Sequence, residues 1–215
     1  MSFIIKNLKV ETIIAISELT IPSQEVTCIV GQSGSGKSTF MRLLNNLDNP
    51  DEGEIFFQNE NIQSLDPIEL RRNVTMVPQS PVIYEGTVKE NLLVGLKFSE
   101  NEAASDAELE NSLQLMRLNK GLDTVAKDLS GGEKQRLALA RGLLMSAEVY
   151  LLDEPSSSLD DETASDVIKA FMKRTKELNK TVIMVTHDKK LAEQISENII
   201  YMDNYSINND NGGFG

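Results

Sequence analysis

The segment that most constrains the fold is a glycine-rich loop placed directly after an apolar, β-branched run at residues 26–30. The loop fits the pattern G-x-x-x-x-G-K-[ST] and consists of Gly31, Gln32, Ser33, Gly34, Ser35, Gly36, Lys37, Ser38 and Thr39. Glycines let the backbone turn tightly and point successive N–H groups at phosphate oxygens, and a helix that begins here adds the positive end of its dipole. We therefore expect a phosphate-binding loop, with Lys37 reaching the β- and γ-phosphates and the Ser38 hydroxyl binding Mg²⁺.

Apolar runs alternate with helical patterns along most of the chain. The expected strands are residues 3–5, 26–30, 54–57, 74–77, 149–152, 181–185 and 198–202. The expected helices are residues 37–46, 67–72, 88–96, 106–118, 132–146, 162–179 and 189–195. Three of the strand runs are apolar at consecutive positions, which is typical of parallel strands buried on both faces. The pattern predicts a doubly wound α/β fold with a mostly parallel core sheet. With the glycine-rich loop after residues 26–30, this fold resembles the RecA-like core of P-loop NTPases.

Residues 80–129 interrupt this alternation, since they hold two helical patterns and no strong strand. We expect one domain over residues 1–205, with a core at 1–79 and 145–205 and an inserted helical subdomain at 80–144. Residues 1–26 and 53–77 carry shorter, more alternating strands and are expected to form an antiparallel subdomain. The polar, glycine-rich tail at 206–215 is expected to be disordered.

Charge and composition narrow the class of protein. The net charge of −12 argues against non-specific binding of nucleic acid, and indicates either a solvated acidic surface or a face that meets a basic partner. No run approaches the ~18 apolar residues that a membrane span needs. The single cysteine, Cys28, lies in an apolar run, and the first six residues lack a signal-peptide layout. We therefore expect a soluble, cytoplasmic protein.

Two acidic residues follow the apolar run at residues 149–152. In a parallel sheet, carboxylates at the carboxyl end of a strand lie at the edge where ligands bind. Asp153 fits the role of holding Mg²⁺ opposite Ser38, and Glu154 fits that of a general base or water-orienting group. The structural alternative is an acidic pair that ends a strand before Pro155.

Three further candidates each have a structural alternative. Ser130 and Glu133 before an apolar-periodic run form a capping box, yet the adjacent Gly131 and Gly132 also suit a second phosphate contact at a helix N-terminus. His187 follows the strand at 181–185 and is either a surface residue or a hydrogen-bonding partner of a γ-phosphate. Gln79, after the strand at 74–77, either senses Mg²⁺ or the attacking water or is a solvated loop residue.

Together these residues resemble the nucleotide-binding domain of ATP-binding cassette (ABC) transporters over residues 3–203. The most specific part resembles the ABC signature and consists of Leu129, Ser130, Gly131, Gly132 and Glu133, followed by Lys134, Gln135 and Arg136. By this resemblance residues 31–39 would be the Walker A loop, and Asp153 and Glu154 the Walker B pair with Glu154 catalytic. Gln79 would couple Mg²⁺ to the helical subdomain, and His187 would hold the γ-phosphate.

The resemblance also implies an assembly. Ser130, Gly131 and Gly132 would contact ATP bound to a second copy of the chain, and Asp160 would lie at the interface of the two. ATP and Mg²⁺ are then the implied cofactors, an ATP-dependent homodimer the implied state, and hydrolysis the step that loosens it. Energy would pass to integral membrane transporter subunits on separate chains, which would place this chain at the inner face of the cell membrane.

One position departs from the family, and two other functions compete. The family stacks adenine on an aromatic residue before the phosphate loop, whereas residues 10–15 contain none, so an aliphatic residue such as Val10 or Ile13 is expected to cover the base. A non-transport ABC-type ATPase acting on nucleic acid or the ribosome is the main alternative. The single cassette, the absence of heptads and the acidic charge weigh against it. The presence of Glu154 weighs against an ATP sensor without turnover.

Overall fold

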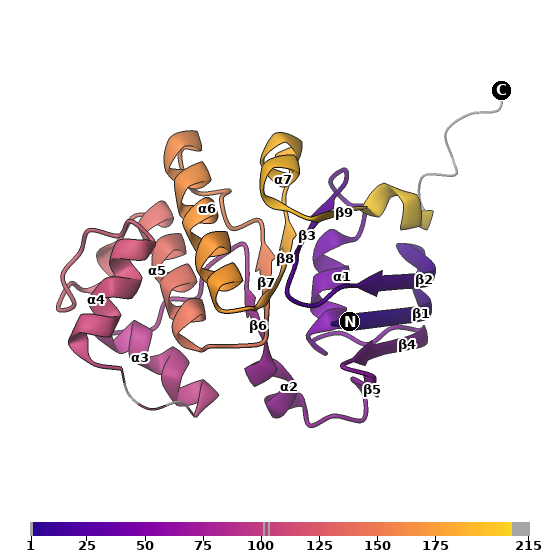
Figure 1. Ribbon diagram of the computed structural model, residues 1–215, viewed down its shortest axis with the longest axis horizontal. Coiled ribbons are helices and arrows are strands. Elements are labelled where there is room, and N and C mark those ends of the chain that lie inside the picture. The colour runs from indigo at the N-terminus through magenta and orange to yellow at the C-terminus, as the bar shows by residue number, and fades with distance from the viewer. Residues whose placement is uncertain (1, 101, 103, 208–215) are drawn as a thin grey trace.

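The computed structural model describes residues 2–100, 102 and 104–207. Figure 1 shows two sheets side by side, with helices gathered mainly at one end of the molecule. The strands are β1 (Phe3–Val10), β2 (Ile14–Ile21), β3 (Val26–Val30), β4 (Glu52–Phe57), β5 (Glu60–Asn61), β6 (Val74–Val77), β7 (Val149–Asp153), β8 (Thr181–Val185) and β9 (Asn198–Tyr201). The α-helices are α1 (Lys37–Leu44), α2 (Pro67–Asn73), α3 (Val88–Ser99), α4 (Asp106–Leu115), α5 (Gly131–Leu144), α6 (Asp161–Glu177) and α7 (Lys189–Ile195), and two 3₁₀ turns are η1 (Ala126–Asp128) and η2 (Met202–Tyr205).

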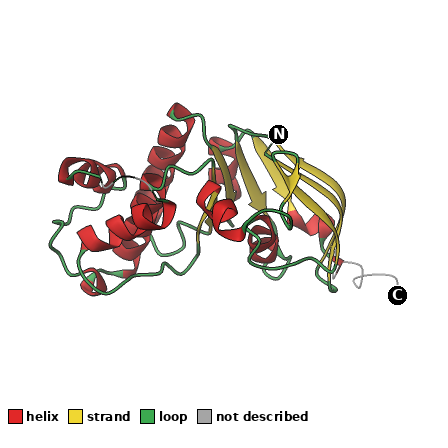
Figure 2. Cartoon of the chain, turned by 90° about the horizontal axis from the view of Figure 1, so that it is seen from below, coloured by secondary structure: helices red, strands yellow, loops and turns green. Residues whose placement is uncertain are grey.

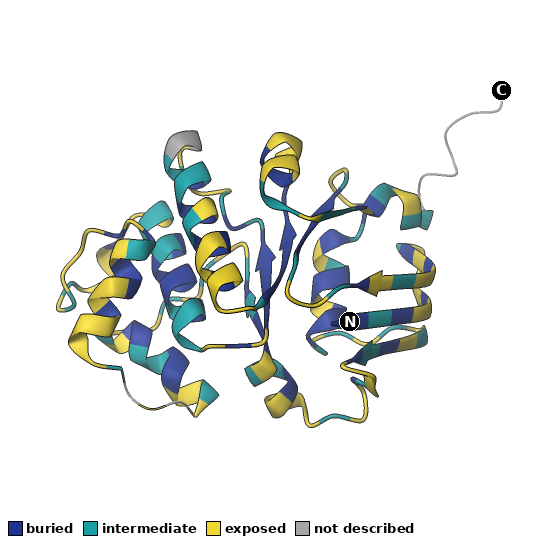
Figure 3. Cartoon of the chain, viewed as in Figure 1, coloured by how far each residue is buried: buried dark blue, intermediate teal, exposed yellow. Residues whose placement is uncertain are grey.

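The larger sheet is parallel and has the strand order β6-β7-β8-β3-β9. β3, β7 and β8 are buried at every position, as Figure 3 shows. Successive side chains in these strands join different cores: Tyr150 and Leu152 pack in one hydrophobic cluster, while Val149 and Leu151 pack in the other. The consecutive apolar positions in the sequence are therefore explained by burial on both faces of the sheet.

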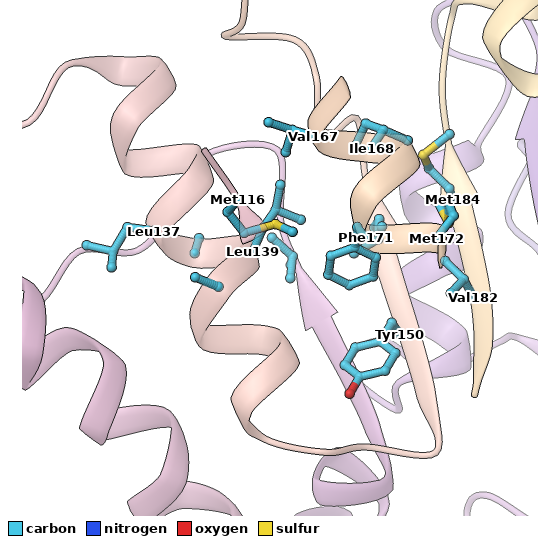
Figure 4. Packing of buried hydrophobic residues seen from close by; sticks show 14 of the residues in the cluster. Met116, Leu137, Leu139, Tyr150, Val167, Ile168, Phe171, Met172, Val182 and Met184 are labelled. Carbon is cyan, nitrogen blue, oxygen red and sulfur yellow. The ribbon is translucent and has the colours of Figure 1, made fainter. Parts of the chain in front are cut away.

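The first cluster joins the parallel sheet to the helices α5 and α6. Figure 4 shows Phe171 of α6 facing Tyr150 of β7, and their rings meet edge to face with centroids 5.5 Å apart. Leu137 and Leu139 of α5 belong to the same cluster. Cys28 of β3 is buried in this cluster as well, and burial raises the pKa of its thiol to about 11.

The smaller sheet is antiparallel and has the order β2-β1-β4-β5. Its strands alternate between buried and exposed positions, since one face packs on α1 and the other meets solvent. The second cluster fills the space between this sheet, α1 and the parallel sheet, with Phe3, Phe40 and Ile183 as members.

The helices α3, α4 and α5 form the end of the molecule farthest from the antiparallel sheet (Figures 1 and 2). In the sequence they lie between β6 and β7, which are neighbouring strands of the parallel sheet. Each begins with a capping box, in which a Ser or Thr side chain accepts from a backbone N–H and a Glu side chain accepts in return. The helical segment is thus an insertion that leaves the sheet intact.

The α/β class and the mixture of a parallel and an antiparallel sheet are confirmed, with corrections in detail. Residues 74–77 are expected in the antiparallel subdomain, but the structure places them in the parallel sheet, because β6 pairs in parallel with β7. β2 and β5 were not predicted as separate strands, since β2 alternates with polar residues and β5 has only two residues. Of the tail expected to be disordered, Ser206 and Ile207 pair with Ile14 and Ile13, and residues 208–215 lie outside the described residues.

Candidate nucleotide-binding site

Four strands of the parallel sheet deliver the predicted residues to one edge. The carboxyl ends of β3, β6, β7 and β8 lead respectively into the glycine-rich loop, Gln79, Glu154 and His187. A cavity of about 410 Å³ lies there, lined by Ile13, Ser33, Gly34, Gly36, Lys37, Ser38, Thr39, Gln79, Glu154 and His187. The volume is within the range of small-molecule sites, and its position is that of ligands in open α/β sheets.

The glycine-rich loop closes onto the start of α1 through Gly36. This residue adopts φ 90°, a left-handed conformation that favours glycine. A Cβ atom there would lie 2.7 Å from Cγ1 of Ile14. The sequence therefore needs glycine at this position both for the turn and for the close approach of the first residue of β2.

Lys37 is buried at the first position of α1 and its side chain folds over the loop. Its Nζ donates to the carbonyl oxygens of Gly31 and Gln32 at 2.9 and 2.7 Å. Ser35, also in the loop, has a buried hydroxyl oxygen without a hydrogen-bond partner among the described residues. A buried ammonium, an unpartnered hydroxyl and the amides of a helix N-terminus together form a donor-rich surface, which suits a phosphate.

Ser38 and Asp153 lie together, as predicted. The Ser38 hydroxyl donates to Oδ1 of Asp153 at 3.2 Å. Asp153 is 6% exposed, and its burial, aided by the charge of Glu154, raises the pKa of its carboxyl group. The described residues include no cluster of three or more His, Cys, Asp or Glu side chains that could hold a metal alone. One hydroxyl and one carboxylate still fit Mg²⁺, since this ion takes oxygen ligands and keeps places for water and substrate phosphates.

Glu154 is held between two other predicted residues. Its Oε2 accepts from Nε2 of Gln79 at 3.0 Å, and its Oε1 contacts Nε2 of His187. The backbone of Glu154 lies in the left-handed region, with φ 46°, and its N–H donates to the Val185 carbonyl oxygen at 3.1 Å. The two side-chain contacts hold the carboxylate beside the glycine-rich loop.

The site therefore brings Gln79, Glu154 and His187 into direct contact. The strand ends in the sequence place all three at one edge of the sheet, but the contacts between them are visible only in the structure. Gln79 and His187 are exposed, while Glu154 is less so, with a side chain 16% exposed. The alternative that Gln79 and His187 are merely solvated surface residues thus does not explain their positions, because each also contacts the Glu154 carboxylate.

Ser130, Gly131, Gly132 and Asp160 do not line this cavity. The capping box is present: Glu133 N–H donates to Ser130 Oγ at 3.3 Å, and Ser130 N–H donates to Glu133 Oε2 at 2.8 Å. Asp160 caps α6 by accepting from Thr163 N–H at 3.0 Å, and this hydrogen bond lowers the pKa of its carboxyl group.

The two glycines of this segment differ in their surroundings. A Cβ at Gly132 would lie 2.9 Å from the Ser158 carbonyl oxygen, so close packing against the segment before α6 requires glycine there. A Cβ at Gly131 would meet nothing within 4 Å, and both Ser130 and Gly131 are exposed. Within the described residues, then, the capping box explains Ser130 and Glu133, and packing explains Gly132, but neither explains Gly131.

Of the two aliphatic residues expected to cover the nucleobase, only one lies at the cavity. Ile13 lines the cavity beside the loop, whereas Val10 is 9% exposed and packs in the second hydrophobic cluster. The lining residues drawn from the described chain include no aromatic side chain.

Comparisons with known proteins give consistent matches. A family model described as ABC transporter matches residues 15–157. The L-cystine import ATP-binding protein of Bacillus subtilis is 37% identical over 193 residues, which cover 86% of this chain and 74% of that protein. The lactococcin-A transport/processing ATP-binding protein of Lactococcus lactis is 38% identical over 197 residues, which cover 86% of this chain but only 26% of that protein.

Solved structures agree with these matches. A dimeric ATP-binding cassette in a post-hydrolysis state, bound to ADP and phosphate, superposes with a TM-score of 0.82 at 30% identity, over 95% of this chain and 94% of that one. A bacterial Atm1-family ABC exporter with ATP bound superposes with a TM-score of 0.82 at 28% identity, over 94% of this chain and 37% of that one. The chain thus matches a whole cassette in one case and about a third of a longer protein in the other.

Proposed function

The chain belongs to the ABC transporter family, and from that premise we propose that it binds and hydrolyses ATP as the energy-supplying subunit of a transporter whose membrane-spanning subunits are separate chains. The observation that carries the proposal is the convergence of Gln79, Glu154 and His187 beside a phosphate-binding loop. A cavity that needed only to bind a nucleotide would not require a carboxylate held by two side chains next to the phosphates.

The residues divide into those that bind and those that act on water. The amides of residues 31–39 and the Lys37 ammonium bind the phosphates, and Ser38 and Asp153 would hold Mg²⁺. The metal, when bound, neutralises charge on the phosphate oxygens. Glu154 orients the attacking water and accepts its proton, and His187 and Gln79 both hold its carboxylate in place. His187 also contacts the γ-phosphate, and Gln79 also contacts the metal site.

We also propose that two copies of the chain close around two ATP molecules. Ser130, Gly131 and Gly132 lie at the N-terminus of α5 outside the chain's own cavity, and Gly131 faces open space. A helix N-terminus attracts anions, so this segment is suited to cap the triphosphate held by a second copy. Asp160, which follows the segment that packs on Gly132, then lies near the same interface.

The experiment that tests this function is a hydrolysis assay at several protein concentrations. If a pair of chains forms each site, phosphate released per chain is expected to rise with protein concentration until dimers predominate. Removal of Mg²⁺ with EDTA should abolish turnover, and added Mg²⁺ should restore it. A rate per chain that is independent of concentration and of metal would contradict the proposal.

We propose that the membrane subunit docks in a partly apolar groove between α2, α3 and α5. It has a volume of about 490 Å³, begins near Thr75 and Met76 on β6, and includes the exposed side chains of Ile68, Val82 and Phe98. No helix within the described residues is both long and apolar enough to cross a membrane. Large exposed apolar side chains gathered in one groove mark an interaction site.

The charge of the groove indicates what it binds. Arg71, Arg72 and Arg141 line it. Arg72 is paired with Glu69 and Glu100, whereas Arg71 and Arg141 make no ion pair within the described residues, although the whole chain carries a net charge of −12. Arg141 lies over the ring of Tyr84, 5.3 Å from its centroid, and donates to the Val82 carbonyl oxygen at 2.8 Å. We propose that a segment of the membrane subunit with apolar side chains and a carboxylate occupies the groove, which places this chain at the inner face of the membrane.

Replacing Phe98 by Glu should separate docking from hydrolysis. Phe98 is 57% exposed, so the substitution should not unfold the chain, but it puts a charge into the apolar part of the groove. When each variant is used to capture integral membrane proteins from detergent-solubilised membranes of its own cells, recovery of a multi-span membrane protein is expected to fall at least about tenfold, while hydrolysis by the isolated chain persists. Tyr201→Glu, at an exposed position 47% accessible on β9, is the matched control. Equal retention of the membrane protein by both variants would place docking elsewhere.

The relatives named above are transport proteins, so the alternative of an ATPase acting on nucleic acid or the ribosome gains no support from them.

A further inference from the structure

Glu133 poses an electrostatic problem at the proposed phosphate cap. Its carboxylate lies in the first turn of α5, at the helix end that is proposed to meet the partner's triphosphate. Oε2 is fixed by the Ser130 N–H at 2.8 Å, and the side chain is 21% exposed. This hydrogen bond, followed by one from Lys120, lowers the pKa of Glu133, so the carboxylate is charged at neutral pH. A negative charge here repels an incoming triphosphate.

Lys120 lies where it can cancel that charge. Its Nζ is 3.0 Å from Oε1 of Glu133, the oxygen that takes no part in the capping box. The loop that carries Lys120 is anchored by Leu118, which is 2% exposed and whose N–H donates to the Leu113 carbonyl oxygen at 2.8 Å. The backbone two residues before Lys120 is therefore fixed, which keeps the lysine side chain within reach of Glu133.

The other capping boxes serve as an internal comparison. Glu90 of α3 and Glu108 of α4 occupy the same position in their helices. Neither makes an ion pair within the part of the chain that the structure describes. A capping box as such thus needs no lysine, and the ion pair is found at the helix end that is proposed to face phosphate.

We propose that Lys120 is a positioning residue for ATP-driven dimerisation, because it neutralises Glu133 and lets Ser130 and Gly131 approach the partner's triphosphate. The inference rests on the proposed function, since it requires the cap to act across a dimer. Lys120 itself need not touch the nucleotide.

The test uses the Glu154→Gln chain, in which hydrolysis is slowed, and measures the ATP concentration that gives half-maximal dimer by sedimentation velocity. Lys120→Ala is expected to raise this concentration about tenfold, because it leaves the charge of Glu133 uncompensated. Adding Glu133→Gln should restore the original value, since glutamine keeps the capping box without the charge. High salt should also reduce the defect.

The matched control is Lys89→Ala, which removes the surface ion pair with Asp106 in the same helical segment. A value for Lys120→Ala equal to that of Lys89→Ala would overturn the inference. So would a defect that persists in the Lys120→Ala/Glu133→Gln chain, because the lysine would then act on the fold and not on the charge. If the Glu154→Gln chain itself fails to dimerise with ATP, the proposed function fails and this inference with it. If it dimerises and Lys120→Ala behaves as the control, only this inference fails.

Discussion

Replacing Glu154 by glutamine is expected to lower ATP turnover about 100- to 10,000-fold, the range associated with loss of a general base. Both carboxylate oxygens of Glu154 are engaged, one by Gln79 and the other by His187, so the side chain is held in one orientation. Glutamine has the same size and can keep one of these contacts, but its amide does not accept the proton of the attacking water. The loss should therefore fall on chemistry and not on binding.

The same substitution should stabilise the dimer. With hydrolysis slowed, ATP stays between the two chains, and a ligand that binds only the closed state shifts the population toward it. Size-exclusion chromatography with ATP and Mg²⁺ should show a dimer for the variant and mostly monomer for the unmodified chain. Glu148→Gln is the control, since Glu148 precedes the same strand at its opposite end and pairs with Lys180 at 2.8 Å. Unchanged turnover in Glu154→Gln would assign the base to another residue.

The sequence predicts where these side chains lie because the groups come from strand ends. β3, β6 and β8 have the predicted bounds, since each is an apolar run bounded by polar, glycine or proline residues. The carboxyl ends of parallel neighbours meet at one edge, so Gln79, Glu154 and His187 can be placed together before any coordinates are known. That Glu154 is the shared partner of the other two depends on side-chain directions, which periodicity does not encode.

Other features depend on contacts between distant segments. Ile13 and Val10 are equivalent in the sequence, and only the path of the chain between β1 and β2 places Ile13 at the cavity and Val10 in the core. The pairing of Lys120 with Glu133 joins a loop to a helix start, and neither residue carries a local signal for the other. The docking groove likewise combines side chains from α2, α3 and α5. Such features can be identified only from the folded structure, whereas the phosphate-binding loop can be identified from its own residues.

Replacing Ser130 by arginine is expected to abolish hydrolysis while ATP still binds. Ser130 is exposed and outside the chain's own cavity, so a large side chain fits the isolated chain but obstructs the cap when two chains close. The loss of the capping hydroxyl should cost about 0.5–2 kcal/mol of stability. Ser105→Arg controls for this cost, because Ser105 caps α4 in the same way without a predicted place at the interface. Binding of a fluorescent ATP analogue should be retained by both variants, and hydrolysis only by Ser105→Arg.

Mixing two inactive variants tests whether each site takes residues from two chains. Lys37→Ala removes the ammonium that folds over the loop, and the Ser130→Arg chain keeps that loop. In a mixed dimer, the loop of the Ser130→Arg chain meets the intact cap of the Lys37→Ala chain, which makes one complete site. In an equimolar mixture half of randomly paired dimers are mixed, and each has one of two sites complete, so activity should return to about a quarter of that of the unmodified chain. A mixture that forms dimers with ATP, as sedimentation velocity reports, and is still as inactive as its components would contradict a site assembled from two chains, since a site built within one chain cannot be complemented by another.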